Sequence, residues 1–443
     1  MQLTVTIEAL ASGGEGMGRA DGRLVFVPFT VPGDRVIAEV AEGKGAGQGD
    51  GASHATLVEL LAPGPARVAA PCAHAGTCGG CEWQQASYAV QLETKARTLA
   101  AALQRIGGLE PRACGLRPIV PSPEPYRYRA RAKLHLDRSA GLVFFARRSH
   151  LPVPVASCHL LAPGLEALRA ALGPALLAAR LPARDVSLEW SEVEGRGAAL
   201  LRLPEVSAAL RTRAEGVLAA VPALAGLVLQ AEEGPTALVG DAVLRLARAP
   251  GAPAAGLQRT RPDVFQQANR SANALLVAEA LRLLAPEGED VLELYCGAGN
   301  FTGPLAARAR AVAAVEVQGP ALELARADEA ERQAGTTGAA GSTRFFAGDA
   351  LKLALALSRE RGPSARRFGA ALLDPPREGA RGIGSALREL GVGRAVYVSC
   401  DPATLARDLK GCVGAGFRVA EVVPIDMFPQ THHVEGVVLL ERV

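Results

Sequence analysis

The pattern of apolar and polar positions divides the chain into three parts, the first of which is residues 1–68. Here short apolar segments alternate with glycine-rich turns, and Gly43–Gly51 is predicted to be a flexible loop. The apolar segments span residues 3–9, 23–29, 35–40 and 56–61. Short strands separated by turn residues at this spacing predict a small β-barrel.

The second part, residues 69–252, has a mixed pattern. A helix is predicted from Ser87 to about Gly107, because apolar residues recur there at the spacing of one helical face. These residues are Leu92, Leu99, Leu103 and Ile106. From residue 115 to 250, short strands alternate with helices rich in alanine and leucine. We therefore expect a central α+β domain.

The third part, residues 253–443, repeats the order strand, glycine-rich turn and helix. Its candidate strands end near residues 294, 316, 348, 373 and 399. This order predicts a doubly wound α/β sheet. Because the carboxyl ends of parallel strands meet at one edge of a sheet, the side chains that follow these strands should gather at that edge.

Composition places the chain among globular proteins. Hydrophobic residues make up 49% of its 443 residues and charged residues 21%, and the length predicts about three domains. No apolar run reaches about 18 residues, and the first residues are not those of a secretion signal. We expect a cytoplasmic monomer with no membrane partner. In that reducing compartment, the eight cysteines call for roles other than disulfides.

Basic side chains concentrate in the middle of the chain. The net charge is +3, but residues 127–148 alone carry seven basic side chains against one acidic. If residues 125–134 form a strand, alternate basic side chains share one face: Arg127, Arg129, Arg131 and Lys133. Such a stripe suits the phosphates of a polyanion, although a charged edge strand facing water has the same pattern.

Three cysteines stand within ten residues. Cys72, Cys78 and Cys81 could wrap one loop around a metal centre, and Gly79 and Gly80 permit the tight turn between the last two. Thiol ligands suit zinc and an iron–sulfur cluster equally. A fourth ligand would have to come from elsewhere in the chain, and unligated core cysteines are the alternative.

Another thiol stands where a strand meets a helix. Val396–Val398 is predicted to be a buried parallel strand, and Asp401 and Pro402 are typical of the N-cap and first position of a helix. Cys400 lies between them. The positive end of a helix lowers the pKa of a thiol from about 8.5 and increases the reactive thiolate fraction. We expect a nucleophile here; a small apolar residue closing the strand is the alternative.

A glycine turn follows the first strand of the third part. Residues 290–301 contain Gly297 and Gly299, but they lack the third glycine of a dinucleotide fingerprint and the Gly-Lys-Ser/Thr of a P-loop. Phosphate binding is therefore not implied. A turn of this kind lets the backbone approach a small ligand closely.

Carboxylates follow the next three strands, as Glu316, Asp349 and Asp374. Glu316 stands where the diol of a ribose would need an acceptor. Each acid alone would be a solvated cap, but the ordered set at one edge favours S-adenosylmethionine as the ligand. Glu435 heads the last apolar strand; beside a thiolate and a methyl donor it is a candidate general base, whereas a lone glutamate there would be a turn residue.

These residues belong to motifs that resemble those of a known family. In chain order the motifs are Phe265-x-Gln267-x-Asn269, Leu294-Tyr295-Cys296-Gly297-x-Gly299, Asp374-Pro375-Pro376-Arg377, Ser399-Cys400-Asp401-Pro402 and His433-Val434-Glu435. With the three-cysteine loop, they resemble the S-adenosylmethionine-dependent RNA uracil-C5 methyltransferases. Residues 13–19, 25–28 and 31–34 resemble the OB-like TRAM domain of RNA-modifying enzymes. The resemblance covers nearly the whole chain.

The resemblance implies a role for each residue. Cys400 would be the nucleophile and Glu435 the proton acceptor. The methyl donor would be bound by Gln267, Tyr295, Glu316 and Asp374, alongside Gly297, Gly299 and Asp349. A 4Fe-4S cluster would be held by Cys72, Cys78, Cys81 and Cys158, because the family places its fourth thiol after the basic strand, which favours Cys158 over Cys114. The barrel and cluster resemble the ribosomal branch, so the expected partner is 23S ribosomal RNA.

The chemistry of that family explains why both Cys400 and Glu435 are needed. Uracil C5 is a weak nucleophile, so a thiolate adds at C6, C5 then attacks the methyl group, and a base removes the C5 proton. A transfer-RNA uracil-C5 methyltransferase is one alternative. A cytosine-C5 enzyme commonly has a second thiol near the fourth strand, and Asp374–Arg377 contains none. The non-enzyme alternative is an RNA-binding cluster protein with a degenerate donor fold, which the presence of Cys400 and Glu435 argues against.

Overall fold

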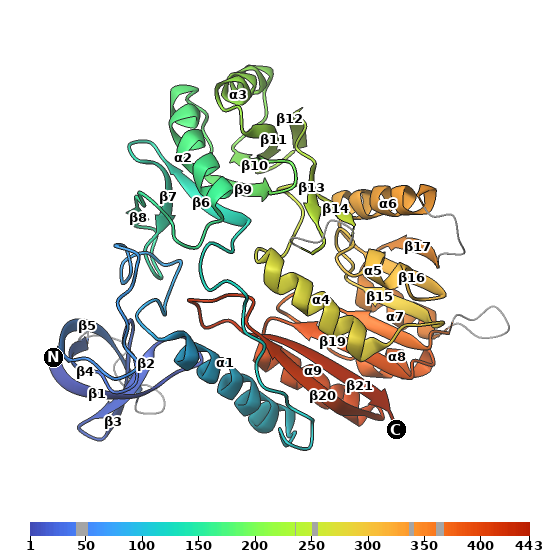
Figure 1. Cartoon of the computed structure of the whole chain (residues 1–443), viewed down its shortest axis with the longest axis horizontal. Helices are drawn as coiled ribbons and strands as arrows, with labels where there is room; N and C mark the ends of the chain where they lie inside the picture. Colours follow the sequence, from blue (N-terminus) through green and yellow to red (C-terminus); the bar gives the residue numbers. More distant parts are fainter. Residues whose placement is uncertain (41–51, 235, 250–255, 336–340, 360–366) are drawn as a thin grey trace.

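Four sheets follow one another along the described part of the chain (Figure 1). The computed structural model describes residues 1–40, 52–234, 236–249, 256–335, 341–359 and 367–443. They form a closed barrel, a central seven-stranded sheet, a two-stranded sheet and a C-terminal seven-stranded sheet. The predicted loop at 43–51 lies outside the described residues. In the part of the chain that the structure describes, no helix has the length and apolar character needed to cross a membrane.

The N-terminal barrel closes in the order β1-β2-β3-β5-β4. Its strands are β1 (Gln2–Leu10), β2 (Gly16–Ala20), β3 (Arg23–Val27), β4 (Arg35–Val40) and β5 (Ala52–Ala62). The four predicted apolar segments are confirmed as β1, β3, β4 and β5. The sequence predicts only a turn at β2, and this is wrong. Gly16 and Gly18 lie inside that strand, where a Cβ would collide with Thr30 and with the backbone of Thr6.

The central sheet has the strand order β12-β11-β10-β9-β6-β7-β8. The strands are β6 (Arg131–Asp137), β7 (Gly141–Phe145), β8 (Pro152–Val153), β9 (Asp185–Ser191), β10 (Arg196–Leu203), β11 (Leu224–Ala231) and β12 (Thr236–Gly240). Helices α2 (Pro163–Ala178) and α3 (Ala208–Ala220) share one hydrophobic core with it. The hairpin of β13 (Leu244–Ala247) and β14 (Leu257–Thr260) then leads to the C-terminal part.

The C-terminal sheet has the order β17-β16-β15-β18-β19-β21-β20. Its strands are β15 (Asp290–Leu294), β16 (Ala311–Glu316), β17 (Ser342–Ala347), β18 (Ala370–Leu373), β19 (Arg394–Ser399), β20 (Phe417–Ile425) and β21 (Glu435–Arg442). The first five run parallel, which confirms the predicted doubly wound sheet, and β21 is antiparallel to both of its neighbours.

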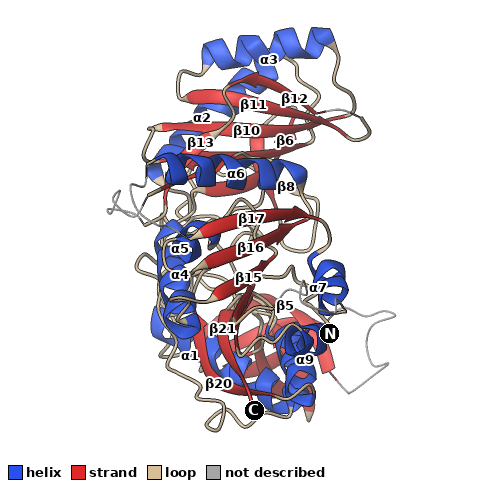
Figure 2. Cartoon of the chain, turned by 90° about the vertical axis from the view of Figure 1, so that its right-hand side faces the viewer, coloured by secondary structure: helices blue, strands red, loops and turns tan. Residues whose placement is uncertain are grey.

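Helices cover both faces of the C-terminal sheet (Figure 2). One face packs on α4 (Arg270–Leu284), α5 (Thr302–Ala306) and α6 (Gly319–Ala334). The other packs on α7 (Ala350–Ser358), α8 (Ile383–Glu389) and α9 (Pro402–Gly414). The carboxyl ends of the parallel strands are left between the two helical layers, where loops can approach them.

Helix α1 (Tyr88–Ala102), continued by a π-helical turn over Leu103–Gly107, packs against the C-terminal sheet. Its start after Ser87 is confirmed. The predicted apolar face is wrong in part. Leu99 and Leu103 are buried, but Ile106 is 43% exposed, whereas the polar Gln91, Thr94 and Lys95 are buried. Gln91 and Lys95 are buried because they form hydrogen bonds with backbone groups of the loop that α1 faces, at Gln430 and Phe428.

A buried carboxylate ties the end of the barrel to the chain that follows it. Asp34 is fully buried and accepts hydrogen bonds from the backbone N–H groups of Val31 at 2.7 Å and Gly64 at 2.8 Å. The guanidinium of Arg67 donates to the same carboxylate, with an Nε–Oδ1 distance of 2.9 Å. Removal of this side chain would leave two buried N–H groups without this acceptor and the Arg67 cation without its carboxylate, although Arg67 would still donate to the carbonyl of Phe29.

We therefore expect Asp34→Ala to lower the opening free energy of the barrel by about 3 kcal/mol. Hydrogen exchange of the amides in β1 and β4 measures that free energy. Glu39→Ala, which alters an exposed side chain of β4, is the control and should change it by less than about 0.5 kcal/mol. Equal effects of the two substitutions would show that Asp34 does not stabilise the barrel.

Candidate active site

The pairing of β19 with β21 brings Cys400 and Glu435 together. In this antiparallel pair Ser399 lies opposite Gly436. The residue after one strand and the first residue of the other therefore lie side by side at the carboxyl edge of the parallel strands. Glu435 is 2% exposed, and Cys400 is half-buried.

The local structure around Cys400 is as predicted. Strand β19 is parallel to β18, and Asp401 is the N-cap of α9 with Pro402 as the first helical residue. The Asp401 carboxylate accepts a hydrogen bond from the N–H of Thr404 at 2.8 Å. Cys400 is thus fixed at the join between a buried strand and a capped helix.

The expected lowering of the Cys400 pKa is wrong for this structure. Burial of the thiol raises its pKa to about 11, and the Glu435 carboxyl contributes in the same direction. The guanidinium of Arg377 lowers the pKa, but it does not overcome these effects. The helix terminus is visible in the sequence, whereas the low-dielectric surroundings and the neighbouring acid depend on tertiary structure.

Glu435 has the same electrostatic character. Burial raises its pKa well above the usual range of a glutamate, and the neighbouring Asp374 adds to the rise, whereas Arg377 opposes it. Arg377 therefore favours the ionised form of both Cys400 and Glu435. The sequence analysis quoted Arg377 within a motif but did not select it as a site residue; its position four residues after the end of β18 was the available signal.

At the first strand, the glycine turn is held by Glu316. One carboxylate oxygen accepts the N–H of Gly297 at 2.9 Å, and the other accepts the N–H groups of Val317 at 2.9 Å and Gln318 at 2.8 Å. Tyr295 has a φ of 64°, a left-handed conformation that costs energy for a non-glycine residue and often marks a functional site.

The other predicted donor-binding residues lie on neighbouring elements. Asp349 caps α7 by accepting the N–H of Lys352 at 2.7 Å. Asp374 directly follows β18, and burial raises its pKa to about 7. Gln267 is buried at 7% exposure in the segment before α4, which begins after its N-cap Asn269. Strand order therefore brings Glu316, Asp349 and Asp374 to the same edge of the sheet as Cys400.

Glu293 is a buried acid that the sequence analysis did not select. One of its oxygens accepts a hydrogen bond from the Thr302 hydroxyl at 2.6 Å, and the other has no partner among the described residues. Burial raises its pKa to about 8, with Asp374 and Glu316 adding to the rise. Its position within the apolar strand β15 could have identified it from the sequence, because burial of a carboxylate costs free energy unless an interaction or a function offsets it.

The four predicted metal-ligating cysteines line one pocket. Cys72, Cys78, Cys81 and Cys158 surround it together with Gln84 and Arg129, and the Gln84 amide contacts the Cys81 sulfur at 3.1 Å. Cys114, the rejected alternative, lies in the core of the C-terminal sheet. Within the described ranges, no three His, Cys, Asp or Glu side chains are grouped closely enough to hold a single metal ion.

The predicted basic stripe does not form one exposed face. Strand β6 begins only at Arg131, and Arg127 before it has a left-handed φ of 58°. Arg129 lines the cysteine pocket. Arg131 donates to the carbonyl oxygens of Pro262 and Val264, and Lys133 pairs with an Asp185 carboxylate oxygen at 2.8 Å. The alternation of a strand therefore applies only to Arg131 and Lys133.

The electrostatics of Cys400 lead to a test with a thiol reagent. We expect Glu435→Gln to speed alkylation of Cys400 by iodoacetamide at pH 8, because loss of the carboxylate lowers the thiol pKa and increases the thiolate fraction. Mass spectrometry of the peptide that contains Cys400 gives the rate. Glu441→Gln is the matched control, since Glu441 lies on the same strand and pairs with Arg418. If Glu435→Gln reacted at the same rate as Glu441→Gln, the effect of Glu435 on the Cys400 pKa would be contradicted.

Two family models match the chain. Residues 256–443 match the tRNA (uracil-5-)-methyltransferase family, and residues 2–46 match the TRAM domain. The first match covers the C-terminal sheet with Cys400 and Glu435, and the second covers most of the barrel.

Curated relatives extend the similarity to the whole chain. The 23S rRNA (uracil(1939)-C(5))-methyltransferase RlmD of Pseudomonas putida is 36% identical over 440 residues, which cover 98% of this chain and 92% of that protein. The protein of the same name from Alkalilimnicola ehrlichii is 35% identical, covering 99% of this chain and 96% of that one.

A solved structure has the same fold from end to end. The tRNA (uracil-54, C5)-methyltransferase of Pyrococcus abyssi, in complex with S-adenosyl-L-homocysteine, matches 99% of this chain and 100% of its own with a TM-score of 0.74, at 23% identity. The fold, the paired Cys400 and Glu435, and relatives similar over nearly their full length lead to one conclusion. The chain belongs to the S-adenosylmethionine-dependent RNA uracil-C5 methyltransferase family.

Proposed function

We propose that this RNA uracil-C5 methyltransferase modifies a uridine of 23S ribosomal RNA, equivalent to the one named in its relatives. The relatives that carry that name align with 98–99% of the chain, and the barrel matches the TRAM model. The observation that carries the residue assignment is the register of β19 and β21, with Ser399 opposite Gly436. That register supplies a nucleophile and a base to one small site.

Cys400 and Glu435 divide the reaction between them. The Cys400 thiolate forms a bond to C6 of uracil, and the electrons of the C5–C6 double bond make C5 nucleophilic. C5 takes the methyl group of the sulfonium donor, whose thioether product leaves with the electron pair. Glu435 then accepts the C5 proton, the double bond re-forms, and the bond from C6 to the Cys400 sulfur breaks. Arg377 favours the ionised forms that both residues need.

The donor is proposed to lie along the edge between β16 and β18. Glu316 would accept hydrogen bonds from a ribose diol, and Gly297 and Gly299 permit close approach of the backbone to the ligand. The other residues proposed to bind the donor are Gln267, Tyr295, Asp349 and Asp374. The methyl donor is a cation, so nearby acids with raised pKa values would be stabilised in their ionised form when it binds.

We propose that the cysteine pocket holds a 4Fe-4S cluster. The four cysteines line one pocket together with Gln84 and Arg129. Four cysteine thiolates are the usual ligands of such a cluster, and this shared pocket is the observation that supports the proposal. Cys72, Cys78, Cys81 and Cys158 would be its ligands.

The basic residues have different expected roles in RNA binding. Arg127 and Lys133 are exposed, and we propose that they contact RNA phosphates. Arg129 and Arg131 were also predicted to bind RNA, but the cysteine pocket and the carbonyl groups of Pro262 and Val264 already engage them. If Arg129 and Arg131 also bind RNA, they do so while keeping these contacts within the protein.

The division of roles predicts a trapped intermediate. Glu435→Gln should lower turnover at least about 100-fold, because the C5 proton stays on the methylated adduct and elimination of Cys400 is blocked. With donor labelled in its methyl group, a labelled protein–RNA band should survive denaturation. A 23S ribosomal RNA fragment should form this band in preference to transfer RNA.

The control for this experiment is Glu435→Gln combined with Cys400→Ala, which should form no band because the covalent bond is lost. Turnover by Glu435→Gln at the wild-type rate would show that another group removes the proton. A band formed with transfer RNA but not with 23S ribosomal RNA would overturn the proposed substrate while leaving the roles of the two residues intact.

The cluster assignment predicts the metal content of the purified protein. Protein purified without oxygen should contain iron and sulfide in equal amounts and absorb visible light. Cys158→Ser should lose most of both, whereas the control Cys114→Ser should retain them, since Cys114 lies in the core of the C-terminal sheet. Stoichiometric zinc without visible absorption would contradict the assignment.

A further inference from the structure

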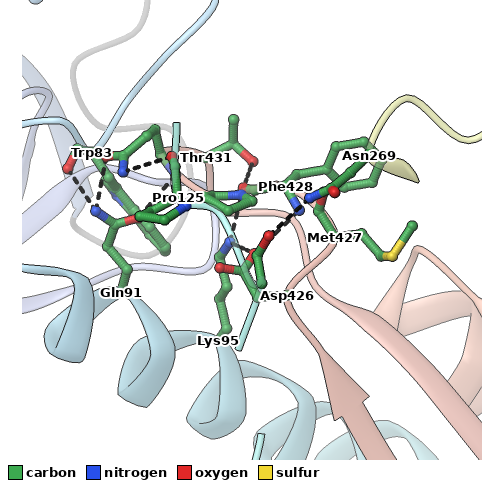
Figure 3. A network of polar contacts seen from close by, with 12 residues as sticks. Trp83, Gln91, Lys95, Pro125, Asn269, Asp426, Met427, Phe428 and Thr431 are labelled. Atoms are coloured by element: carbon green, nitrogen blue, oxygen red, sulfur yellow. Dashed lines mark hydrogen bonds and ion pairs between the residues drawn. The ribbon is translucent and has the colours of Figure 1, made fainter. Parts of the chain in front are cut away.

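The loop that leads into Glu435 is held by helix α1. Residues 426–433 and Val434 join β20 to β21, and we call residues 426–433 the catalytic loop. The Lys95 ammonium group donates to an Asp426 carboxylate oxygen at 2.5 Å and to the carbonyl of Phe428 at 2.9 Å. The side chains of Lys95 and Asp426 are fully buried. Figure 3 shows Lys95 rising from α1 to meet Asp426 and Phe428.

One turn earlier on α1, Gln91 joins three segments of the chain (Figure 3). Its amide oxygen accepts the backbone N–H of Gln430 at 2.9 Å, and its amide nitrogen donates to the Gln430 side-chain oxygen at 3.0 Å. The same nitrogen lies 3.1 Å from the carbonyl of Trp83 and 3.0 Å from that of Ala86. Gln91 therefore contacts the catalytic loop and the segment after the cysteine loop together.

The two loops are also bonded directly. The carbonyl oxygen of Gln430 accepts the backbone N–H groups of Glu82 at 3.0 Å and Trp83 at 3.1 Å, and these residues directly follow Cys81. We call Gln91, Gln430 and these backbone groups the loop junction. Through it, the position of the cysteine loop and that of residues 426–433 depend on each other.

The loop junction holds a conformation that costs energy. Gln430 has a φ of 69°, in the left-handed region that non-glycine residues seldom adopt. Such a residue persists only where its surroundings determine its conformation strongly. Because the Gln91 and Gln430 side chains are buried, a broken bond leaves its partner unsatisfied. The catalytic loop should therefore loosen when the cysteine loop leaves the junction.

We propose that Gln91 and Gln430 are positioning residues that couple occupation of the cysteine pocket to the placement of Glu435. This inference rests on the proposed function, since it takes the cysteine pocket as the site of the cluster. Ligand binding by four cysteines would order the cysteine loop. Through the hydrogen bonds of the junction, an ordered cysteine loop then fixes Gln430, which lies five residues before Glu435.

Coupling of this kind is reciprocal. If cluster binding stabilises the catalytic loop through the junction, then a variant that breaks the junction loses this coupling free energy, and the cysteine loop binds the cluster less tightly. Gln91 contacts none of the four cysteines through the hydrogen bonds of the described chain. A change in metal retention caused by Gln91 would therefore report the coupling and not a lost ligand.

The test is iron release from Gln91→Met, which keeps the side-chain length but removes the amide. Without oxygen, we expect an iron chelator to remove the metal on the order of ten times faster than from the wild-type protein, because the cysteine loop opens more often when the junction is broken. Ser191→Ala is the matched control. It deletes a buried hydroxyl that bonds the carbonyl of Arg245, far from the junction in sequence, and it should leave the release rate unchanged.

Kinetics separate positioning from a loss of folded protein. Gln91→Met should lower kcat and increase the fraction of enzyme trapped as RNA adduct, with the KM for RNA changed less than about twofold, since misplaced Glu435 slows elimination. A purely structural loss would lower active enzyme without enriching the adduct. If Gln91→Met does not fold, Gln430→Met removes the same side-chain bond from the other partner.

Two results would overturn the coupling: unchanged iron release, or unchanged hydrogen exchange at residues 426–433 in the variant. Absence of iron from the wild-type protein would instead refute the proposed cluster. In that case the junction is still tested by hydrogen exchange, because Gln91→Met should speed exchange at the amides of Glu82 and Trp83. Unchanged exchange there would overturn the junction itself.

Discussion

The antiparallel pairing of β21 with β19 is the constraint on which the candidate active site depends. The parallel strands of the sheet deliver their following residues to one edge, but Glu435 lies at the amino end of its strand. It reaches that edge only because β21 runs in the opposite direction, with Gly436 opposite Ser399. A shift of the register by one residue would turn Glu435 toward the other face of the sheet and separate it from Cys400.

In the protein without ligands, the candidate site disfavours the negatively charged forms of its thiol and carboxyl groups. Burial raises the pKa of Cys400, Glu435, Asp374 and Glu293, and Arg377 is the cation that lowers the first two. This arrangement is consistent with the proposed mechanism, in which Cys400 is needed as a thiolate only when RNA and donor are present. A thiol kept neutral until then is also less exposed to oxidation.

Helix α1 connects parts of the chain that are distant in sequence. It packs in the core of the C-terminal sheet, while Lys95 and Gln91 hold the loop before Glu435. Trp83, just before the helix, donates its indole N–H to the carbonyl of Gly14 in the barrel at 2.8 Å. The barrel, the cysteine loop and the catalytic loop therefore share one set of buried contacts. A change in the position of one of them should alter the contacts of the other two.

The sequence by itself determined the elements and the candidate residues. Period-two and glycine-turn patterns located four of the five barrel strands and the five parallel strands of the C-terminal sheet, because those patterns reflect local backbone preferences. Motifs identified Cys400, Glu435 and Asp374, and the ends of the predicted strands identified Glu316 and Asp349. The sequence could not determine which polar residues are buried, since burial depends on what lies opposite. Gln91 and Lys95 have an ordinary helical pattern until the catalytic loop is placed against them. Only the tertiary structure decided that Arg129 lines the cysteine pocket and that the pKa of Cys400 is raised, because charge and burial act through space between residues far apart in the chain.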